Sequence, residues 1–331
     1  MEGNTYVLEV NNLKKYFPIK GGLLKKTVGH VKAVDDISFH VEKNETLSLV
    51  GESGCGKSTT GRTILRLYES TSGEVFFNGE NIMDIPKGKF RGMRKDIQMI
   101  FQDPFSSLNP RMNVKQLLME PILTHKLVSR KEANDLVVEM IEKVGLSKEQ
   151  LNRYPHEFSG GQRQRISIAR ALIVKPKLVI LDEAVSALDV SIQSQILNLL
   201  IQLQDEFELT YIFISHDLNV VKHVSDRVAV MYLGQMMELA ETKDLYENPL
   251  HPYTKALLSA IPSLDPDKKK DRIILQGDVP DPSDPPSGCP FRLRCPMAFD
   301  RCAEEKPEFL EREKNHWVAC HLFDEQEEAD A

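Results

Sequence analysis

The feature of this sequence that most restricts its fold is the segment Gly51-Glu52-Ser53-Gly54-Cys55-Gly56-Lys57-Ser58-Thr59. It matches the pattern G-x-x-x-x-G-K-[ST]. The apolar run Thr46–Val50 precedes it, and Lys57–Tyr68 has helical spacing of its apolar residues. A strand, a glycine turn and a helix in this order are the context that the pattern requires. We therefore interpret the segment as a phosphate-binding loop and not as a chance glycine turn.

The chemistry of phosphate binding explains the residue types in this loop. The glycines let the backbone curl so that its N–H groups face a phosphate, and the helix that begins near Lys57 adds its positive dipole end. Lys57 is expected to reach the β- and γ-phosphates, and the Ser58 hydroxyl is expected to bind Mg²⁺. We interpret Cys55 as a filler residue, whose thiol could have a lowered pKa and react with alkylating agents because it lies near a helix start.

A pair of acids follows the apolar run Leu178–Leu181. An acid at the end of a buried strand beside a phosphate loop is suited to hold Mg²⁺, and this acid is Asp182. Glu183 would then point towards the γ-phosphate, where it can orient and polarise the attacking water. The alternative for the pair is an acidic N-cap that follows a strand.

A second glycine segment, Phe158-Ser159-Gly160-Gly161-Gln162, precedes the predicted helix Gln162–Ile173. Alone it is a weak signal, since Ser-Gly-Gly is usually a loop. At a helix start, however, free backbone N–H groups and a Ser hydroxyl form an anion site. One chain does not need two such sites for one phosphate group. A dimer needs both if the second site of each partner closes on the nucleotide of the other.

Taken in this order, the motifs resemble those of ABC transporter ATPases over roughly residues 6–260. Ser186-Ala187-Leu188-Asp189 resembles the D-loop of that family, with Asp189 as its acid. His216 follows the predicted strand Tyr211–Ile214 and resembles the switch histidine that contacts the γ-phosphate. Gln102 follows Ile97–Phe101 and resembles the Q-loop glutamine, which senses Mg²⁺ and the attacking water and lies where the transmembrane partner docks.

The resemblance also implies an aromatic residue near the N-terminus that stacks on adenine. Phe17 fits this position best, and Tyr16 is the other candidate. Two departures from the family pattern occur, at Phe158, where leucine is commonest, and at Ala184-Val185, where Pro-Thr is common. Neither removes a catalytic group, so the resemblance implies an active ATPase in which Lys57, Gln102, Glu183 and His216 act in catalysis.

Alternation of predicted strands and helices favours an α/β fold, and the resemblance identifies it as a P-loop ABC cassette with a mainly parallel core sheet. Tyr6–Val10 and Ile37–Val41 have the alternation of half-buried strands and predict an N-terminal antiparallel β subdomain. We expect a loop at Ile19–Gly29 between them. Asn113–Leu123 and Arg130–Val144 have helical periodicity, which predicts an inserted helical subdomain over about residues 103–165.

A boundary is expected near Pro262, between a cassette at 1–262 and an extension at 263–331. Before it, His251–Leu258 (HPYTKALL) resembles the extension of oligopeptide and dipeptide importer ATPases. Beyond it, Gly288-Cys289-Pro290-Phe291 and Arg294-Cys295-Pro296 carry the resemblance further. Nickel importers are close relatives within this group, so they stay open as an alternative. Taken without the resemblance, the first segment is a Pro-started amphipathic helix.

Four of the five cysteines, Cys289, Cys295, Cys302 and Cys320, lie close together in the extension. In a large chain without a secretory signal such a cluster favours metal binding over disulfides. The spacing matches neither the C-x₂-C of zinc ribbons nor a ferredoxin run. The family resemblance implies a [4Fe–4S] site, whose negative charge Arg292, Arg294 and Arg301 could offset. Zinc and unligated thiols are the alternatives.

Charge and hydropathy limit the possible partners. The net charge of −7 and the pI of about 5.8 argue against nucleic-acid binding beyond ATP itself. The first residues, MEGNTYVLEV, lack the basic start and long apolar core of a secretory signal. No window of about 18 apolar residues occurs, so the sequence predicts no transmembrane helix. We therefore expect a peripheral protein at the cytoplasmic face of the membrane.

The sequence thus predicts the ATP-hydrolysing subunit of an ABC importer of di- or oligopeptides. Its expected partners are a second ATPase subunit, identical or related, the transmembrane permease subunits and, indirectly, an extracytoplasmic peptide-binding protein. An importer of nickel or another solute is one alternative, and a soluble ABC ATPase that acts on ribosomes or DNA is another. A non-enzymatic iron–sulfur regulator is a third, against which Glu183 and His216 count.

Overall fold

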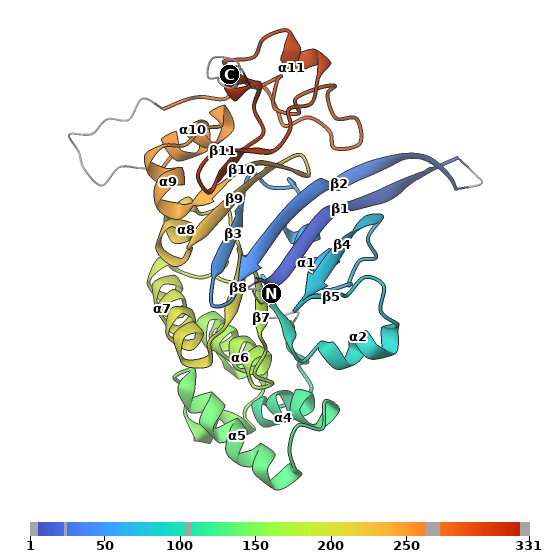
Figure 1. Cartoon of the computed structure of the whole chain (residues 1–331). Coiled ribbons are helices and arrows are strands. Elements are labelled where there is room, and N and C mark those ends of the chain that lie inside the picture. Colours follow the sequence, from blue (N-terminus) through green and yellow to red (C-terminus); the bar gives the residue numbers. More distant parts are fainter. Residues whose placement is uncertain (1–5, 23–24, 104–106, 262–271, 325–331) are drawn as a thin grey trace, which may run out of the picture. The chain divides into compact units, whose positions relative to one another are not determined.

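The computed structural model describes residues 6–22, 25–103, 107–261 and 272–324 (Figure 1). The chain divides into two compact units that alternate along the sequence. The first unit is built from segments 1–8, 41–46 and 77–214, and the second from segments 9–40, 47–76 and 215–331. The predicted boundary near Pro262 lies outside the described residues.

Three parallel strands form the core of the first unit. They are β6 (Ile97–Ile100), β7 (Leu178–Asp182) and β8 (Thr210–Ile214), and β7 lies between the other two. Every residue of β7 and β8 is buried. Near-continuous apolar runs are typical of parallel strands that are covered on both faces. The strands predicted at 97–101, 178–181 and 211–214 are therefore confirmed.

Two helices of the first unit, α4 (Val114–Thr124) and α5 (Arg130–Lys143), pack against each other, as the green part of Figure 1 shows. Each begins with a capping box, formed by Asn113 and Gln116 in α4 and by Ser129 and Glu132 in α5. These pairs satisfy backbone groups that a helix start leaves open. The helices predicted at 113–123 and 130–144 are confirmed to within a residue or two.

The other helices of the first unit are α2 (Lys87–Met93), α6 (Gly160–Leu172) and α7 (Val190–Phe207). One face of α7 is apolar and buried, with Ile196, Leu199 and Leu203 spaced by three and four residues. This spacing predicts an amphipathic helix. Within the described ranges, every helix is too short or too polar to cross a bilayer.

The second unit contains a mixed sheet with strand order β11-β12-β10-β9-β3. Its strands are β3 (Thr46–Val50), β9 (Arg227–Tyr232), β10 (Gln235–Glu241), β11 (Leu310–Glu313) and β12 (His316–Val318). Strand β3 pairs parallel with β9, and the remaining pairs are antiparallel. The C-terminal segment therefore adds two strands to the sheet that carries the phosphate loop, and the sequence did not predict this.

Strands β1 (Tyr6–Gly21) and β2 (Lys26–Glu42) form a long hairpin beside β4 (Ser72–Phe77), as Figure 1 shows in blue. Strands were predicted here, but the loop predicted at Ile19–Gly29 is wrong, because both strands run almost to the turn. The outer part of the hairpin is largely exposed on both faces. Strands without a buried face lack the alternation by which a sequence reveals them.

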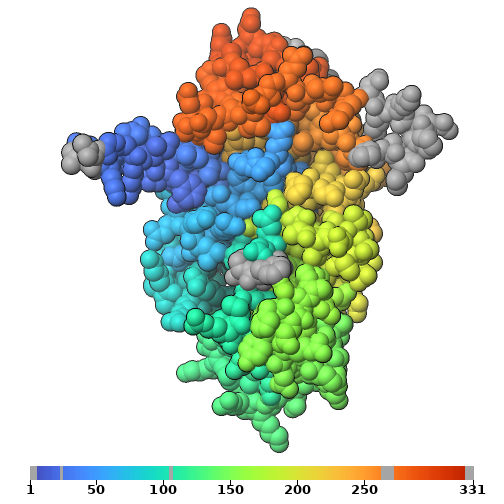
Figure 2. Space-filling model, turned by 180° about the vertical axis from the view of Figure 1, so that it is seen from behind, coloured from blue at the N-terminus to red at the C-terminus, as the bar shows by residue number. Residues whose placement is uncertain are grey.

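The short helices of the second unit are α1 (Lys57–Ile64), α8 (Leu218–Val224), α9 (Thr242–Glu247), α10 (Pro252–Ser259) and α11 (Arg301–Glu304). Of these, α1 ends at Ile64, before the predicted Tyr68, and α10 has Pro252 in its first turn as predicted. In the space-filling view, residues after 272 form one continuous surface region, coloured orange (Figure 2).

A fully buried carboxylate, Glu238 on β10, ties the C-terminal segment to this unit. It accepts hydrogen bonds from the N–H groups of Leu250 (2.6 Å) and His251 (3.0 Å), and it contacts His316 Nε2 at 2.7 Å. A buried charge needs such partners to offset its lost hydration. His251 Nδ1 in turn accepts the N–H of Tyr253 and caps α10. The His-Pro-Tyr segment is therefore a helix start held by Glu238.

Complete burial lowers the pKa of His251 from 6.5 to about 4, although Glu238 opposes the shift. Because the folded pKa lies below the unfolded value, the unfolded chain binds more protons between these two values, and stability is lost as pH falls from about 6.5 towards 4.

We expect the unfolding free energy to fall by about 2 kcal/mol between pH 7.5 and pH 5 on account of this histidine alone. In His251→Asn this part of the pH dependence should disappear, because Asn does not titrate. Urea unfolding at the two pH values measures the difference, and His223→Asn, at an exposed position, is the matched control. An unchanged pH dependence in His251→Asn would contradict the assignment.

Candidate nucleotide site

The phosphate loop lies between β3 and α1, as predicted, and its lysine is held inside it. Lys57 is 4% exposed, and its Nζ donates hydrogen bonds to the carbonyl oxygens of Gly51 (2.8 Å) and Glu52 (3.0 Å). A buried ammonium group needs such acceptors. The loop backbone thus fixes one positive charge at the start of a helix, where N–H groups without helical partners already favour an anion.

Two glycines of the loop are required by its geometry. Gly51 has φ +145° and Gly56 has φ +106°, and a Cβ at either position would lie 2.2 Å from a backbone oxygen, of Met231 or of Ala33. Gly56 is also the N-cap of α1, and its oxygen accepts the N–H of Thr60 at 2.9 Å. At these two positions the loop therefore packs against neighbouring backbone so closely that no side chain fits.

Cys55 lies inside the loop with 3% exposure. Burial raises the pKa of its thiol, and the nearby Lys57 only partly opposes this. The expectation of a lowered pKa and easy alkylation is therefore wrong, because desolvation outweighs the nearby charge and the helix start.

The acid pair lies at the end of β7 in the first unit. Asp182 is 1% exposed, and Glu183 has a left-handed backbone with φ +48°. Glu183 Oε2 accepts a hydrogen bond of 2.8 Å from Gln102 Nε2. The structure therefore brings together the two residues that the sequence assigned to the attacking water. A non-glycine residue in this conformation costs roughly 1–2 kcal/mol, and such strain is concentrated at functional sites.

The second glycine segment forms the start of α6 in the first unit. The Ser159 hydroxyl accepts the Gln162 N–H at 3.4 Å, and Gln162 Oε1 accepts the Ser159 N–H at 3.1 Å. This is a capping box, which uses the hydroxyl within the helix start. Gly160 is half-buried. At Gly161 a Cβ would lie 2.4 Å from Ile192 Cγ2 on α7, so this glycine permits close helix packing.

Asp189 is the N-cap of α7, in the same unit as α6. Its side chain is exposed and makes no capping hydrogen bond. The next residue, Val190, is 79% exposed, which is unusual for a large apolar side chain at a helix start. The predicted D-loop therefore ends in two exposed residues, Asp189 within it and Val190 directly after it.

His216 belongs to the second unit, with the phosphate loop. It is exposed and follows Ser215, whose N–H donates to Leu49 O on β3 at 3.2 Å. The next residue, Asp217, is the N-cap of α8 and accepts the Asn219 N–H at 2.9 Å. The backbone on both sides of His216 is therefore fixed by hydrogen bonds.

The two adenine-stacking candidates lie on β1. The Phe17 ring is half-buried, with Tyr68 edge-on at 5.3 Å and Lys15 Nζ 4.6 Å from its centroid. The Tyr16 hydroxyl donates a hydrogen bond to Asp35, and burial raises its pKa. Phe17 stays the better candidate because its ring has no polar group already committed to a partner.

Sequence reasoning missed how Glu52 is held. Its carboxylate accepts two hydrogen bonds from Arg294, of 2.6 and 3.1 Å, and its N–H donates to Tyr253 Oη at 3.0 Å. The partners lie some two hundred residues further along the chain, so no local pattern could have indicated them.

The oxygen donors assigned to Mg²⁺ are Ser58, in the second unit, and Gln102 and Asp182, in the first. A hydroxyl, an amide oxygen and a carboxylate are the ligand types that Mg²⁺ prefers, so these residues fit the ion chemically.

The iron–sulfur prediction is wrong. Among the described residues, which include all four cysteines of the extension, no group of three or more potential ligands is placed to hold a metal ion. This finding applies equally to the zinc alternative. Burial raises the pKa of Cys289 to about 11 and that of Cys320 to about 12, and it also raises the pKa of Cys295. Metal ligation requires thiolates, which these surroundings disfavour.

The arginines expected to balance a cluster have other partners. Arg294 pairs with Glu52, Arg301 pairs with Glu305 at 2.9 Å, and Arg292 donates to the Ser287 carbonyl at 2.9 Å. Their charges thus serve contacts within the protein. Spacing along the sequence placed the cysteines near one another but did not specify a ligand geometry.

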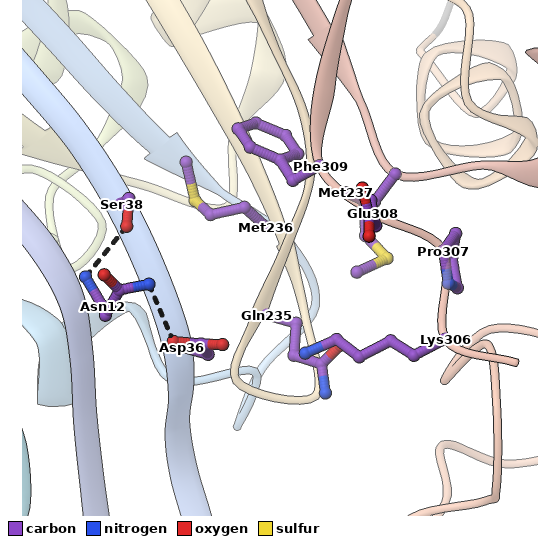
Figure 3. Close-up of a pocket in the computed structure, with 11 residues that line it drawn as sticks. Asn12, Asp36, Ser38, Gln235, Met236, Met237, Lys306, Pro307, Glu308 and Phe309 are labelled. Atoms are coloured by element: carbon purple, nitrogen blue, oxygen red, sulfur yellow. Dashed lines mark hydrogen bonds between the residues drawn. The ribbon is translucent and has the colours of Figure 1, made fainter.

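A separate pocket of about 320 Å³ lies in the second unit (Figure 3). Asn12 lines it, bonded through its backbone N–H to Ser38 and through its side chain to Asp36. Gln235, Met236 and residues 306–309 complete much of the wall. None of the predicted nucleotide-site residues is among the described residues that line this pocket, so it is distinct from that site.

Comparison with known proteins identifies the relatives of this chain. The family model for ABC transporter matches residues 34–186, and the model for the oligopeptide/dipeptide transporter C-terminal region matches residues 237–302. The oligopeptide transport ATP-binding protein AppF of Bacillus subtilis is 56% identical over 96% of this chain and 97% of its own. OppF of Escherichia coli, with the same description, is 52% identical over 98% of both chains.

The dipeptide transport ATP-binding protein DppF of Haemophilus influenzae is 49% identical over 97% of this chain and 98% of its own. Among solved structures, the ATP-binding cassette MJ0796, a dimer in a post-hydrolysis state bound to ADP and Pi, is similar with a TM-score of 0.63. The identity is 26%, over 71% of this chain and 98% of that one. CbiO1 of Clostridium perfringens, part of the ABC transporter complex CbiONQ, gives a TM-score of 0.64 at 27% identity, over 74% and 92% of the two chains.

The loop geometry predicts that Gly56→Ala lowers stability by about 1–3 kcal/mol and weakens ATP binding, because the new methyl group meets the Ala33 carbonyl in a left-handed conformation. Gly54→Ala is the matched control, since its φ is also positive but nothing lies within 4 Å of its Cβ. Thermal unfolding and ATP titration measure both effects. Equal losses in the two variants would show that crowding at Gly56 is unimportant.

Proposed function

The chain belongs to the ABC transporter family, and we propose that it is the ATP-hydrolysing subunit of an importer of oligopeptides or dipeptides. The observation that carries this proposal is the full-length similarity, at 49–56% identity, to transport ATP-binding proteins that are described by those substrates. The C-terminal match at 237–302 supports the same substrate class. All three relatives are described as peptide transport proteins, and the similarity spans nearly the whole of each, which favours this interpretation over a soluble ABC ATPase or a nickel importer.

Nucleotide binding begins at the phosphate loop. Lys57 and the loop N–H groups hold the triphosphate, and Phe17 stacks on the adenine. Ser58, Gln102 and Asp182 would hold Mg²⁺, which neutralises phosphate charge when it is bound. The buried position of Lys57 and the chemistry of these oxygen donors support this assignment.

Hydrolysis depends on Glu183, which orients the attacking water and accepts its proton. Gln102 donates to Oε2 of this carboxylate and so fixes the direction in which its other oxygen points. His216 contacts the γ-phosphate from the backbone position fixed by its neighbours. The left-handed backbone at Glu183 supports a functional role, since such strain needs a compensating benefit.

Two such subunits, identical or related, enclose the nucleotides between them. In each, the α6 start at Ser159-Gly160-Gly161-Gln162 and the D-loop residue Asp189 face the nucleotide of the partner. The exposure of Ser159, Asp189 and Val190 supports this arrangement, as does the dimeric state of the cassette similar in structure. The subunits work with transmembrane permeases at the cytoplasmic face of the membrane. An extracytoplasmic binding protein delivers peptide to these permeases.

We assign residues 1–262 to the ATPase cassette, with its helical part at about 103–165, and residues 263–331 to the C-terminal extension. The family match at 237–302 spans this boundary, and the strands β11 and β12 join the sheet of the cassette. The extension is therefore structurally continuous with the unit that holds the phosphate loop.

Glu183→Gln should keep ATP binding but lower turnover by about 10²–10⁴-fold, because the amide cannot accept the proton of the water. Lys57→Ala should lose binding as well. ATP titration and phosphate release of the purified variants separate these two effects. Normal turnover in Glu183→Gln would refute the role given to this residue.

Peptide import itself is tested in proteoliposomes that contain the chain with its permease subunits and binding protein. We expect ATP-dependent accumulation of labelled oligopeptide or dipeptide and stimulation of ATPase activity by the peptide-loaded binding protein. Accumulation of Ni²⁺ without peptide would favour the nickel importer instead. Recovery of the chain with ribosomes and without permeases from detergent-solubilised membranes would favour the soluble ATPase.

A further inference from the structure

A bidentate ion pair joins the C-terminal extension to the phosphate loop within the second unit. Arg294 Nη1 and Nη2 donate to the two carboxylate oxygens of Glu52, at 2.6 and 3.1 Å. The Arg294 side chain is 9% exposed and that of Glu52 is 29% exposed. Paired, short hydrogen bonds between charged groups are the strong and geometrically specific kind.

A buried aromatic cluster sets the position of Arg294. Phe291 is fully buried, with its ring 5.3 Å from Tyr232 and 5.2 Å from Tyr253. Arg294 lies one turn later, and its N–H donates to the Phe291 carbonyl at 3.0 Å. Its guanidinium also lies 5.9 Å from the centre of the Tyr232 ring. The extension therefore presents Arg294 from a rigid support.

Glu52 is the residue through which this contact reaches the loop lysine. Arg294 holds its carboxylate, Tyr253 Oη accepts its N–H, and its carbonyl accepts Lys57 Nζ at 3.0 Å. The same carbonyl accepts the Cys55 N–H at 3.3 Å, so each polar group of Glu52 has a partner, and two of these partners, Tyr253 and Arg294, come from residues after 250. A change at the Glu52 carboxylate therefore acts, through the backbone carbonyl of the same residue, on the Lys57 ammonium group that would hold the phosphates.

The charge of Glu52 gives the contact a second effect. A carboxylate in a loop that receives a triphosphate repels that ligand, and the repulsion is strong where solvent is partly excluded. Arg294 balances this charge and holds it on the side of the loop that faces the extension. Without the arginine, the carboxylate is free to turn towards the phosphates.

We propose that Arg294 is a positioning residue for the phosphate loop, through which the C-terminal extension sets the ATP affinity. The inference rests on the proposed function, since it requires that the loop binds ATP. Arg294 acts through Glu52 and not by touching the nucleotide.

A double-mutant cycle tests this role by titrating the purified full-length chain with a fluorescent ATP analogue. We expect Arg294→Gln to weaken binding by about tenfold, the size of coupling for a partly desolvated charge pair. In the E52Q background the same change should weaken binding by less than about twofold, because no carboxylate remains to be released. Arg294→Lys should bind more tightly than Arg294→Gln but less tightly than the parent chain, because lysine keeps the positive charge but lacks the paired N–H donors of arginine.

ATPase kinetics provide the second readout, in which KM should rise in Arg294→Gln while kcat stays within about twofold. Arg292→Gln is the matched control, because Arg292 lies in the same turn but donates to Ser287 and not to the loop. Thermal unfolding of each variant shows whether the fold is kept.

An Arg294→Gln effect of equal size in both backgrounds would overturn the inference, because the arginine would then act on the nucleotide directly or through general stability. Wild-type affinity in Arg294→Gln would overturn it as well. In both cases the proposed function stands if the parent chain binds ATP and Lys57→Ala does not. Absence of ATP binding by the parent chain would instead contradict the proposed function.

Discussion

The structure depends on placing one ammonium group inside a turn of backbone. Lys57 is buried at the start of α1. The positive charge of its ammonium group therefore adds to the positive end of the helix dipole at the same place. Burial of a charge is unfavourable unless polar groups surround it. The carbonyls of Gly51 and Glu52 supply them, and this requires the tight path that only glycine permits at Gly51 and Gly56. The loop therefore depends on neighbouring backbone that approaches it closely at both glycines.

Those surroundings come from distant parts of the chain. Strand β3 pairs with β9, the Gly234 N–H donates to the Cys55 carbonyl at 2.9 Å, and Arg294 holds Glu52. The residues proposed to orient the attacking water lie instead in the first unit, just after the ends of β6 and β7. There Gln102 and Glu183 are adjacent because their strands are neighbours in register. In each unit the proposed site residues thus follow the end of a strand that pairs in parallel with its neighbour, β3 with β9 in one and β6 with β7 in the other.

The sequence predicted what is local and repetitive. The apolar runs of β7 and β8, the loop pattern and the helical periodicity of α4 and α5 all carry their own signals. The outer hairpin of β1 and β2 was missed because strands exposed on both faces show no alternation, and β11 and β12 because their partner β10 precedes them by some seventy residues. The cysteine spacing misled, since spacing conveys neither ligand geometry nor the burial that keeps Cys289 and Cys320 protonated.

The parallel pairing of β3 with β9 has a consequence for synthesis of the chain. The phosphate loop leaves the ribosome early, but its sheet neighbour at 227–232 and its clamp at Arg294 follow much later. Until then, the buried strand β3 lacks a neighbouring strand on that side, and a newly made chain is exposed to aggregation in this interval. A polypeptide released before residue 294 would contain every loop residue and still lack the contact that fixes Glu52.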